Sequence, residues 1–414
     1  MSGIDWVVLI GATAFIVIYG IWKTRNNRDI DAYLPGDHKT PWWTIGLSVM
    51  ATQASAITFL STPGQAFSDG MRFIQFYFGL PIAMVIICIF FIPRFFRMKV
   101  FTVYEFLEQR FDLRTRLLAA FLFLIQRGFG AGITIFAPAI IFSAILGWNL
   151  NLTIIIIGLL VTLYTFIGGT TAVNVTHKLQ MAVMMGGIIT ALIMTIYLLP
   201  EGIGFLDSLQ IAGAHGRMNI IDFNFDIDNR YTFWSGITGC TFLALAYFGT
   251  DQSQAQRYLS GQSVRQSRLG LMFNAFFKIP MQFIILLTGV MVYVFYQFHP
   301  SPVFFNSHVE TEILATPSRD EYLGLKERWD QEFQLRQLLY SGIQSGDESS
   351  LLSAELDQSI SAEKQIRQET KLLVEKALPE AESRDTDYIF IRFILDFLPR
   401  GIIGLLIAAI LAAG

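Results

Sequence analysis

The residues that could do chemistry are polar side chains set inside long apolar runs. Gln53, Ser55 and Thr58 crowd into one such run, within the stretch SVMATQASAITFLSTPG at 48–64. A membrane helix broken at such a place frees backbone carbonyls, and carbonyl and hydroxyl oxygens suit a hard alkali cation. The same small polar residues could instead serve only to let helices pack closely. Both interpretations stay open from the residues alone.

A second polar group ends the apolar run near 232–255. Tyr247 and Phe248 precede Gly249, and the sequence becomes polar from Asp251 onward. Glycine permits an unwound backbone, and the aromatic pair could stack on a solute or close over it. The alternative is an interfacial aromatic belt beside a polar helix end.

Two cations stand alone in apolar sequence, where ionisable residues are costly and are therefore functional candidates. Lys278 lies in NAFFKIPMQF, from which it could snorkel to the interface or reach a central cavity. Arg127 lies in FLIQRGFGAGITIFAP. Its guanidinium could pair with a carboxylate on a solute or with a group on another helix.

The elements that must position these residues are membrane-spanning helices. Apolar residues make up 53% of the 414-residue chain and charged residues only 15%, against roughly 25% charged in an average soluble protein. A helix that crosses a bilayer needs about 20 mostly apolar residues. Such runs occur near 4–22, 41–62, 72–97, 117–146, 150–168, 178–199, 232–255, 271–297 and 386–414. The sequence therefore predicts an all-α polytopic protein that crosses the lipid bilayer nine times.

The positions of the charges predict the orientation of these spans. Lys and Arg cluster after the first, third and seventh spans, whereas the intervening loops are short or acidic, as at 200–230. Because Lys and Arg concentrate in cytoplasmic loops, we expect an external N-terminus. Residues 301–385 are polar, with leucines at helical spacing, and predict an amphipathic helical hairpin on the external face. Its charges favour a solvated face over a binding site.

Several classes of function find no support in the sequence. Cys88 and Cys240 both lie in apolar runs, which disfavours a disulfide scaffold and offers no metal-ligand spacing. The sequence shows no nucleophile–base pair, metal cluster or phosphate-binding loop, so neither an enzyme nor a nucleic-acid-binding protein is expected. The final run, LLIAAILAAG, ends without a charged flank. We therefore expect it to be an incomplete span of a longer protein.

Several motifs, in their order along the chain, resemble those of the sodium:solute symporter family. DAYLPGDHKTPWWTIGLSVMATQASAITFLSTPG is similar to the family's first loop and first core helix. FTVYEFLEQRFDLRTR at 101–116 is similar to its cytoplasmic segment between core helices two and three. Three more stretches match further signatures: YTFIGGTTAV at 164–173, YFGTDQSQAQRYLSG at 247–261 and FLPRGIIGLLIAAILAA at 397–413. The resemblance covers nearly everything outside 301–385.

The resemblance implies a transporter core of two inverted five-helix repeats, with core helices one and six broken near the bilayer midplane. Mapped onto this chain, it implies an extra N-terminal helix at 1–24 and a first repeat at 41–199. The second repeat would begin at 231–300 with core helices six and seven. An extramembrane insert at 301–385 and an incomplete core helix eight at 386–414 would follow.

The resemblance also implies Na+ as the coupling ion. Backbone carbonyls would bind it at Ala51, Ala54 and Ala413, together with serines expected just beyond Gly414. The family often has an aspartate in place of His177, where it supports a second sodium ion in some members. Its absence here favours either one sodium ion per cycle or a different role for this end of the helix.

The expected solute site combines residues from several spans. The candidate solute-binding residues are Gln53, Ser55, Thr58, Gln75, Arg127, Tyr247 and Lys278, and the candidate gate residues are Phe248 and Thr62. Tyr247 and Lys278 are similar to an aromatic inner gate and a lysine near the solute in the sugar-transporting members. Ala244 and Tyr77, however, stand where those members read hydroxyl groups, which favours an anionic solute over a neutral hexose.

We therefore expect sodium-coupled symport of a small organic solute, a carboxylate or a sialic acid-like anion, by alternating access. The protein would lie in the cell inner (plasma) membrane as a multi-pass protein. A sodium-coupled hexose symporter is the alternative within the family. A transporter-like membrane solute sensor that signals through 301–385 is the alternative from another class.

Overall fold

The computed structural model describes residues 1–24, 40–98, 100, 102–146, 148–226, 228–344, 350–381 and 383–412. This part of the chain is mostly helical and contains no β-strand, only one isolated bridge between Thr40 and Gly261. Apolar runs favour helices in a membrane because a helix satisfies its own backbone hydrogen bonds where water is absent. The all-α prediction is confirmed for the described residues.

The first half of the chain folds into helices that are often short. Their bounds are α1 Gly3–Thr24, α3 Trp42–Gln53, α4 Ala56–Asp69, η1 Gly70–Tyr77, α5 Leu80–Ile86, η2 Ile87–Phe91, α6 Ile92–Met98, α7 Val103–Arg110, α8 Leu113–Leu146 and α9 Leu150–Tyr197. Here η1 is a 3-10 helix and η2 is a π-helical turn. The span predicted at 72–97 is thus a succession of four helical pieces, from η1 to α6.

The second half contains one long central helix and a helical hairpin. The bounds are α10 Phe205–Ala214, α11 Phe233–Gly249, α12 Gln252–Leu259, α13 Val264–Phe298, α14 Ser307–Ile313, α15 Arg319–Gln344, α16 Ser350–Ala377, α17 Thr386–Phe397 and α18 Ile402–Ala412.

Among the residues that the structure describes, four helical stretches are long and apolar enough to cross a membrane. They are Ile57–Met98, Leu113–Ile140, His177–Tyr197 and Val264–Phe298. Three shorter apolar helices, Gly3–Ile16, Leu150–Leu159 and Phe233–Gly249, coincide with further predicted spans. The breaks account for part of the difference from the nine predicted spans, since the run predicted at 41–62 is divided between α3 and α4.

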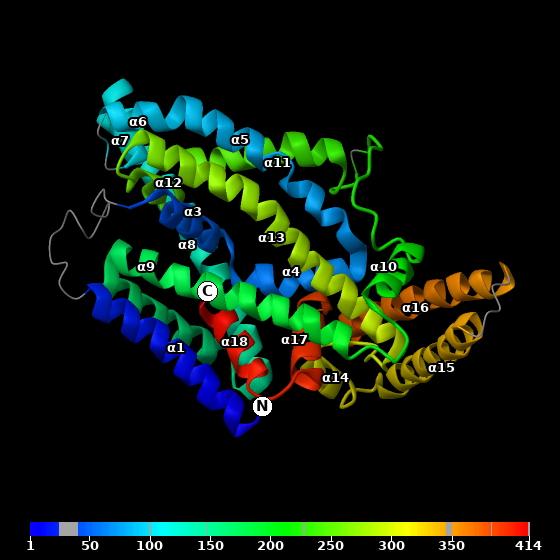
Figure 1. Cartoon of the computed structure of the whole chain (residues 1–414). Helices are drawn as coiled ribbons and strands as arrows, with labels where there is room; N and C mark the ends of the chain where they lie inside the picture. The colour runs from blue at the N-terminus through cyan, green and yellow to red at the C-terminus, as the bar shows by residue number, and fades with distance from the viewer. Residues whose placement is uncertain are drawn as a thin grey trace.

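Helix α13 forms the centre of the structure, where it packs against α3, α4, α9 and η1 (Figure 1). It is buried along most of its length, whereas the Leu113–Ile140 part of α8 is exposed. The crossing of α13 and α4 is very close, because a Cβ atom at Gly289 would collide with the backbone carbonyl of Pro63. Only glycine allows this approach.

Helix α9 corrects one feature of the predicted topology. The spans expected separately at 150–168 and 178–199 belong to one continuous helix of 48 residues. The sequence between them contains no proline to interrupt the helical hydrogen bonds. A straight helix of that length would measure about 72 Å, more than twice the roughly 30 Å of a bilayer core.

Residues 301–385 contain the predicted helical hairpin. Helices α15 and α16 lie side by side and project from one end of the helical bundle (Figure 1). Trp329, Tyr322, Ile366 and Val374 form a small apolar core between them. The two helices of the expected hairpin are present, whereas its location outside the membrane and on the external face stays a prediction.

A buried ion pair joins the hairpin to the bundle. Asp385, which precedes α17, is fully buried and accepts hydrogen bonds from Arg367 Nη2 at 2.6 Å and from the Phe305 N–H at 3.0 Å. Lys371 Nζ lies 3.5 Å from the same carboxylate. The Arg367 guanidinium lies 4.9 Å above the centre of the Phe305 ring and 6.0 Å from that of Phe67 on α4. One side chain of α16 thus links α4, α17 and the segment after α13.

A histidine makes a second junction between the hairpin and the bundle. His215 Nδ1 lies 3.0 Å from the Tyr293 hydroxyl on α13, and its Nε2 lies 3.2 Å from the Tyr340 hydroxyl on α15. Burial lowers the pKa of His215 to about 4, with smaller contributions from the positive charges of Arg217 and Arg336. The imidazole is therefore neutral at physiological pH.

Candidate functional site

The first break in a core helix lies between α3 and α4. Ala54 ends α3 with φ −88° and ψ 78°, and Ser55 is extended, so helical hydrogen bonding stops at these residues. The Ala54 N–H donates to the Ala51 carbonyl at 3.1 Å, and Thr58 Oγ1 donates to the Gln53 carbonyl at 3.3 Å. A carbonyl oxygen has two lone pairs, so it can also bind a cation. The broken helix predicted from the sequence is present.

The candidate cation ligands are only partly described. Ala51 and Ala54 are both buried at this break, where their carbonyls could hold Na+. Ala413 lies outside the described residues. Within those residues no group of three or more His, Cys, Asp or Glu side chains could hold a metal ion. This donor set fits an alkali cation bound by neutral oxygens better than a transition metal.

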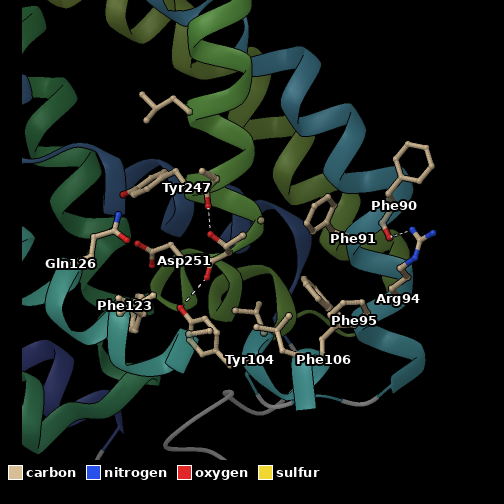
Figure 2. A pocket seen from close by; sticks show the side chains of 18 residues that line it. Phe90, Phe91, Arg94, Phe95, Tyr104, Phe106, Phe123, Gln126, Tyr247 and Asp251 are labelled. Carbon is tan, nitrogen blue, oxygen red and sulfur yellow. Dashed lines mark hydrogen bonds between the residues drawn. The ribbon is translucent and has the colours of Figure 1, made fainter. Parts of the chain in front are cut away.

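The second break separates α11 from α12 at Thr250 and Asp251. Asp251 caps α12, since its Oδ1 accepts the Ser253 N–H at 2.8 Å. The Tyr104 hydroxyl of α7 donates to the Thr250 carbonyl at 3.0 Å (Figure 2). Arg127 Nη1 of α8 lies 3.8 Å from Asp251 Oδ2. Arg127 thus pairs with a group on another helical segment, which is one of the two roles predicted for it. The sequence alone did not identify Asp251 as the partner.

Tyr247 and Phe248 lie just before the second break. Gln254 Nε2 donates to the Tyr247 hydroxyl at 2.8 Å, and the two aromatic rings meet edge to face with centroids 5.1 Å apart. Phe248 is buried. Tyr247 lines a cavity of about 690 Å³ between η2, α6, α7, α8 and α11, whose walls are mainly apolar and rich in aromatic rings (Figure 2). Asp251 and Gln126 supply polar groups to this wall.

Lys278 is a basic residue buried inside the helical bundle. It lies on α13 with only 1% of its surface exposed, so it does not snorkel to an interface. Its Nζ lies 5.7 Å from the centre of the Tyr77 ring. In the part of the chain that the structure describes, Lys278 has no carboxylate within ion-pair distance. A buried ammonium held only by an aromatic ring retains most of its electrostatic cost.

The Lys278 face of α13 reaches the first break. Asn274 precedes the lysine by four residues, and its Oδ1 accepts a hydrogen bond from Gln53 Nε2 at 3.4 Å. The structure therefore connects Gln53 at the end of α3 with the lysine-bearing face of α13. The predicted gate residue Thr62 and the predicted solute ligand Thr58 are both buried on α4.

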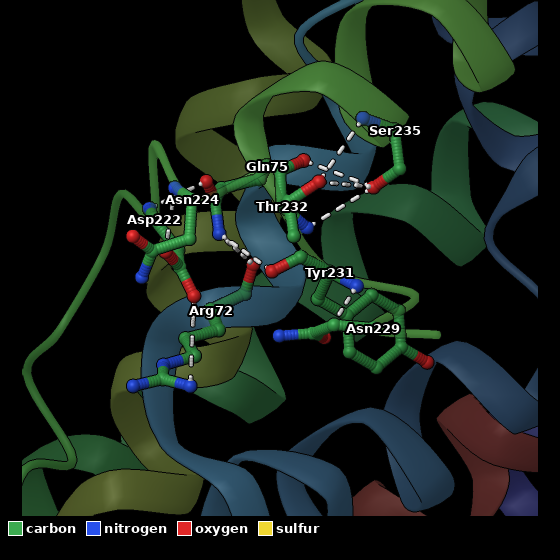
Figure 3. Close-up of polar contacts among 8 residues, drawn as sticks. All are labelled: Arg72, Gln75, Asp222, Asn224, Asn229, Tyr231, Thr232 and Ser235. Carbon is green, nitrogen blue, oxygen red and sulfur yellow. Dashed lines mark hydrogen bonds and ion pairs between the residues drawn. The ribbon is translucent and has the colours of Figure 1, made fainter. Parts of the chain in front are cut away.

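Gln75 has its polar groups occupied by a loop. Its Oε1 accepts the Asp222 N–H at 2.8 Å, and its Nε2 donates to the Tyr231 carbonyl at 3.1 Å (Figure 3). Arg72 Nη1 also lies 3.9 Å from the Asp222 carboxylate. Gln75, which is fully buried, thus fixes the segment between α10 and α11 to η1. A tertiary contact of this kind leaves no signal in the local sequence.

Comparisons with known proteins agree on one family. Residues 33–313 match the family model described as "Sodium:solute symporter family". The human sodium/iodide cotransporter is 30% identical over 280 residues, which are 67% of this chain and 43% of that relative. Mouse sodium-coupled monocarboxylate transporter 2 is 31% identical over 278 residues, 65% of this chain and 44% of the relative. This chain thus spans less than half the length of these curated relatives.

The fold has a counterpart among solved structures. A Na+-coupled sialic acid symporter in a substrate-bound outward-open state superposes with a TM-score of 0.74 at 23% identity, over 100% of this chain and 71% of that chain. That similarity confirms the all-α transporter fold, whereas the inverted repeat stays a prediction. Together with the apolar helices, the sequence matches support a multi-pass membrane protein, and these relatives are transporters and not enzymes. The chain belongs to the sodium:solute symporter family.

Proposed function

We propose that the protein is a sodium-coupled symporter that carries a small organic anion across the membrane by alternating access. The observation that carries this proposal is Lys278, a fully buried cation with no carboxylate partner among the described residues. Leaving a buried charge uncompensated costs several kcal/mol. An anionic solute beside Lys278 would supply the missing charge.

The proposed sodium site lies at the break between α3 and α4. The carbonyls of Ala51 and Ala54 would bind Na+ there, and Ala413 would contribute a third carbonyl. Inward sodium movement is favoured by about 2.3 kcal/mol per charge per 100 mV of membrane potential. Sodium shifts the protein between outward-facing and inward-facing states only if it binds them unequally.

The proposed solute ligands fall into two groups. Gln53, Ser55 and Thr58 lie at the first break, within reach of the Lys278 face of α13 through the Gln53–Asn274 hydrogen bond. Tyr247 is the proposed solute ligand beside the second break, and Phe248 and Thr62 are the proposed gate residues.

Arg127 and Gln75 are proposed as conditional ligands. Arg127 pairs with Asp251, and Gln75 is hydrogen-bonded to a loop, so each would have to release its present partner to bind solute. In the present structure these contacts tie both side chains to neighbouring segments of the chain.

The relatives and the sequence pattern favour the same class of solute. The relatives' names specify iodide and monocarboxylate, and the structural neighbour's specifies sialic acid, all of which are anions. A sodium-coupled hexose symporter is the second candidate, because Tyr247 and Lys278 match an aromatic gate and a lysine of the sugar-transporting members. We place the protein in the cell inner (plasma) membrane with an external N-terminus, and we assign it no catalytic activity.

The test is uptake by the full chain in proteoliposomes, with and without an inward sodium gradient. Labelled sialic acid, short carboxylates and hexoses would be offered separately. We expect sodium-dependent accumulation of an anion, which Ser55→Ala or Thr58→Ala reduces at least tenfold. Binding without accumulation would reject transport and favour a membrane solute sensor, and accumulation of hexoses alone would favour the second candidate.

A further inference from the structure

Three polar residues form a buried stripe along α13. Asn274, Lys278 and Gln282 are spaced four residues apart, so they lie on one face of the helix over successive turns. None of the three has more than 1% of its surface exposed. Their Cα atoms span eight residues, or about 12 Å along the helix axis. We call this set the α13 polar stripe.

The two amides of the α13 polar stripe have unmet hydrogen-bonding capacity. Among the described residues, neither Nε2 nor Oε1 of Gln282 has a partner, and Nδ2 of Asn274 has none. Only Asn274 Oδ1 is engaged, by Gln53. A buried polar group without a partner costs about 1–3 kcal/mol. Three such atoms on one helix face therefore require acceptors and donors from a ligand or from ordered water.

The charge of Lys278 limits what that ligand can be. An ammonium in the middle of the stripe repels a cation, so the amide oxygens do not form a second sodium site. The ammonium is matched by an anionic group. An amide offers both donor and acceptor atoms, as a hydroxyl group does, so the amides are matched by hydroxyl groups. The stripe is thus complementary to a carboxylate that carries hydroxyl groups on either side.

We propose that Asn274 and Gln282 bind the solute on either side of Lys278 and select a polyhydroxylated carboxylate. This inference rests on the proposed symport of an organic anion. A halide or a short aliphatic acid contacts one turn of the stripe and leaves the amides unpaired. A longer hydroxylated acid can pair its carboxylate with Lys278 and its hydroxyl groups with the amides of Asn274 and Gln282. Sites built to bind hydroxyl groups discriminate strongly against analogues that lack them, because their own polar groups are then left unpaired.

The test compares three probes in sodium-driven uptake: N-acetylneuraminate, glucuronate and propionate. Asn274→Leu keeps the branched shape of the side chain and Gln282→Met keeps approximately its length, and both remove the amide. We expect each variant to raise KM for the two hydroxylated acids at least tenfold and to change KM for propionate less than twofold. Gln297→Met makes the same change elsewhere on α13, at another buried amide, and should alter none of the three values.

Each other outcome overturns a defined part of the inference. An equal loss for all three probes would mean that the amides act only in packing or bind water. A preference of the unmodified protein for propionate would reject the proposed selectivity and leave anion symport intact. Uptake of no anion under a sodium gradient would reject the proposed function itself. If Gln282→Met is not produced in folded form, Gln282→Asn shortens the amide and should give the same selective rise in KM.

Discussion

The ion pair between Arg367 and Asp385 predicts a large loss of stability when the arginine is removed. In Arg367→Met, the buried Asp385 carboxylate loses its 2.6 Å hydrogen bond and keeps only Lys371 at 3.5 Å and the Phe305 N–H. Breaking one partner of a buried pair typically costs about 3–5 kcal/mol. The remaining lysine places the expected cost near the lower end, at about 3 kcal/mol. A smaller part of this loss of stability comes from the cation–π contact between Arg367 and the Phe305 ring, which the variant also removes.

Hydrogen–deuterium exchange of the purified full chain measures this loss locally. An opening free energy lowered by about 3 kcal/mol would speed exchange of protected α16 amides by about a hundredfold. Arg328→Met is the matched control, because Arg328 pairs with Glu369 at 2.7 Å while the arginine is exposed and the glutamate is half-buried. Exposed pairs contribute at most about 1 kcal/mol. If Arg367→Met speeds exchange no more than Arg328→Met, the buried pair does not hold the hairpin to the bundle.

Three further predictions concern pH, packing and the second break. Burial lowers the pKa of His215 from 6.5 to about 4, so the unfolded chain takes up the proton first and the free energy of unfolding falls as pH decreases from about 6.5 towards 4. His215→Gln should flatten this part of the pH profile of the melting temperature. An unchanged profile would reject this role of His215. Gly289→Ala should destabilise the protein by about 1–3 kcal/mol through overpacking against α4, whereas Gly186→Ala, which meets open space, should be neutral or slightly stabilising in the same melts. The melting temperature should fall in Arg127→Asp and in Asp251→Arg. In the double variant the two substitutions should partly compensate each other, with a coupling free energy of about 1 kcal/mol. Purely additive losses would mean that the ion pair contributes nothing to stability.

The breaks in the core helices could be predicted because their causes are local. Small and polar residues around Ser55 and a glycine at 249 weaken the helix where the chain must unwind, and both breaks occur within two residues of these positions. The continuous α9 was not predicted, since the polar residues between the apolar runs at 150–168 and 178–199 indicated two separate spans. Helix continuity depends on packing against α1, α3, α8 and α13 as much as on local sequence.

The partners of the polar residues required the three-dimensional structure. Lys278 and Arg127 were recognised as candidates from their apolar surroundings, but sequence alone could not choose between their alternative roles. Burial of α13 excludes snorkelling for Lys278, and Asp251 supplies the partner of Arg127. Gln282 was missed although its spacing of four residues from Lys278 was visible. An amide in an apolar run carries little signal until its burial and missing partners are known.

The measurement that tests the central claim most directly is anion uptake by proteoliposomes that contain either the unmodified chain or Lys278→Met. Methionine is similar in length to the apolar stem of lysine and lacks the ammonium group. The proposed mechanism predicts anion accumulation that requires an inward sodium gradient and falls at least tenfold in the variant. Accumulation that persists without sodium, or that is unchanged in Lys278→Met, would contradict sodium-coupled transport of an anion bound at Lys278.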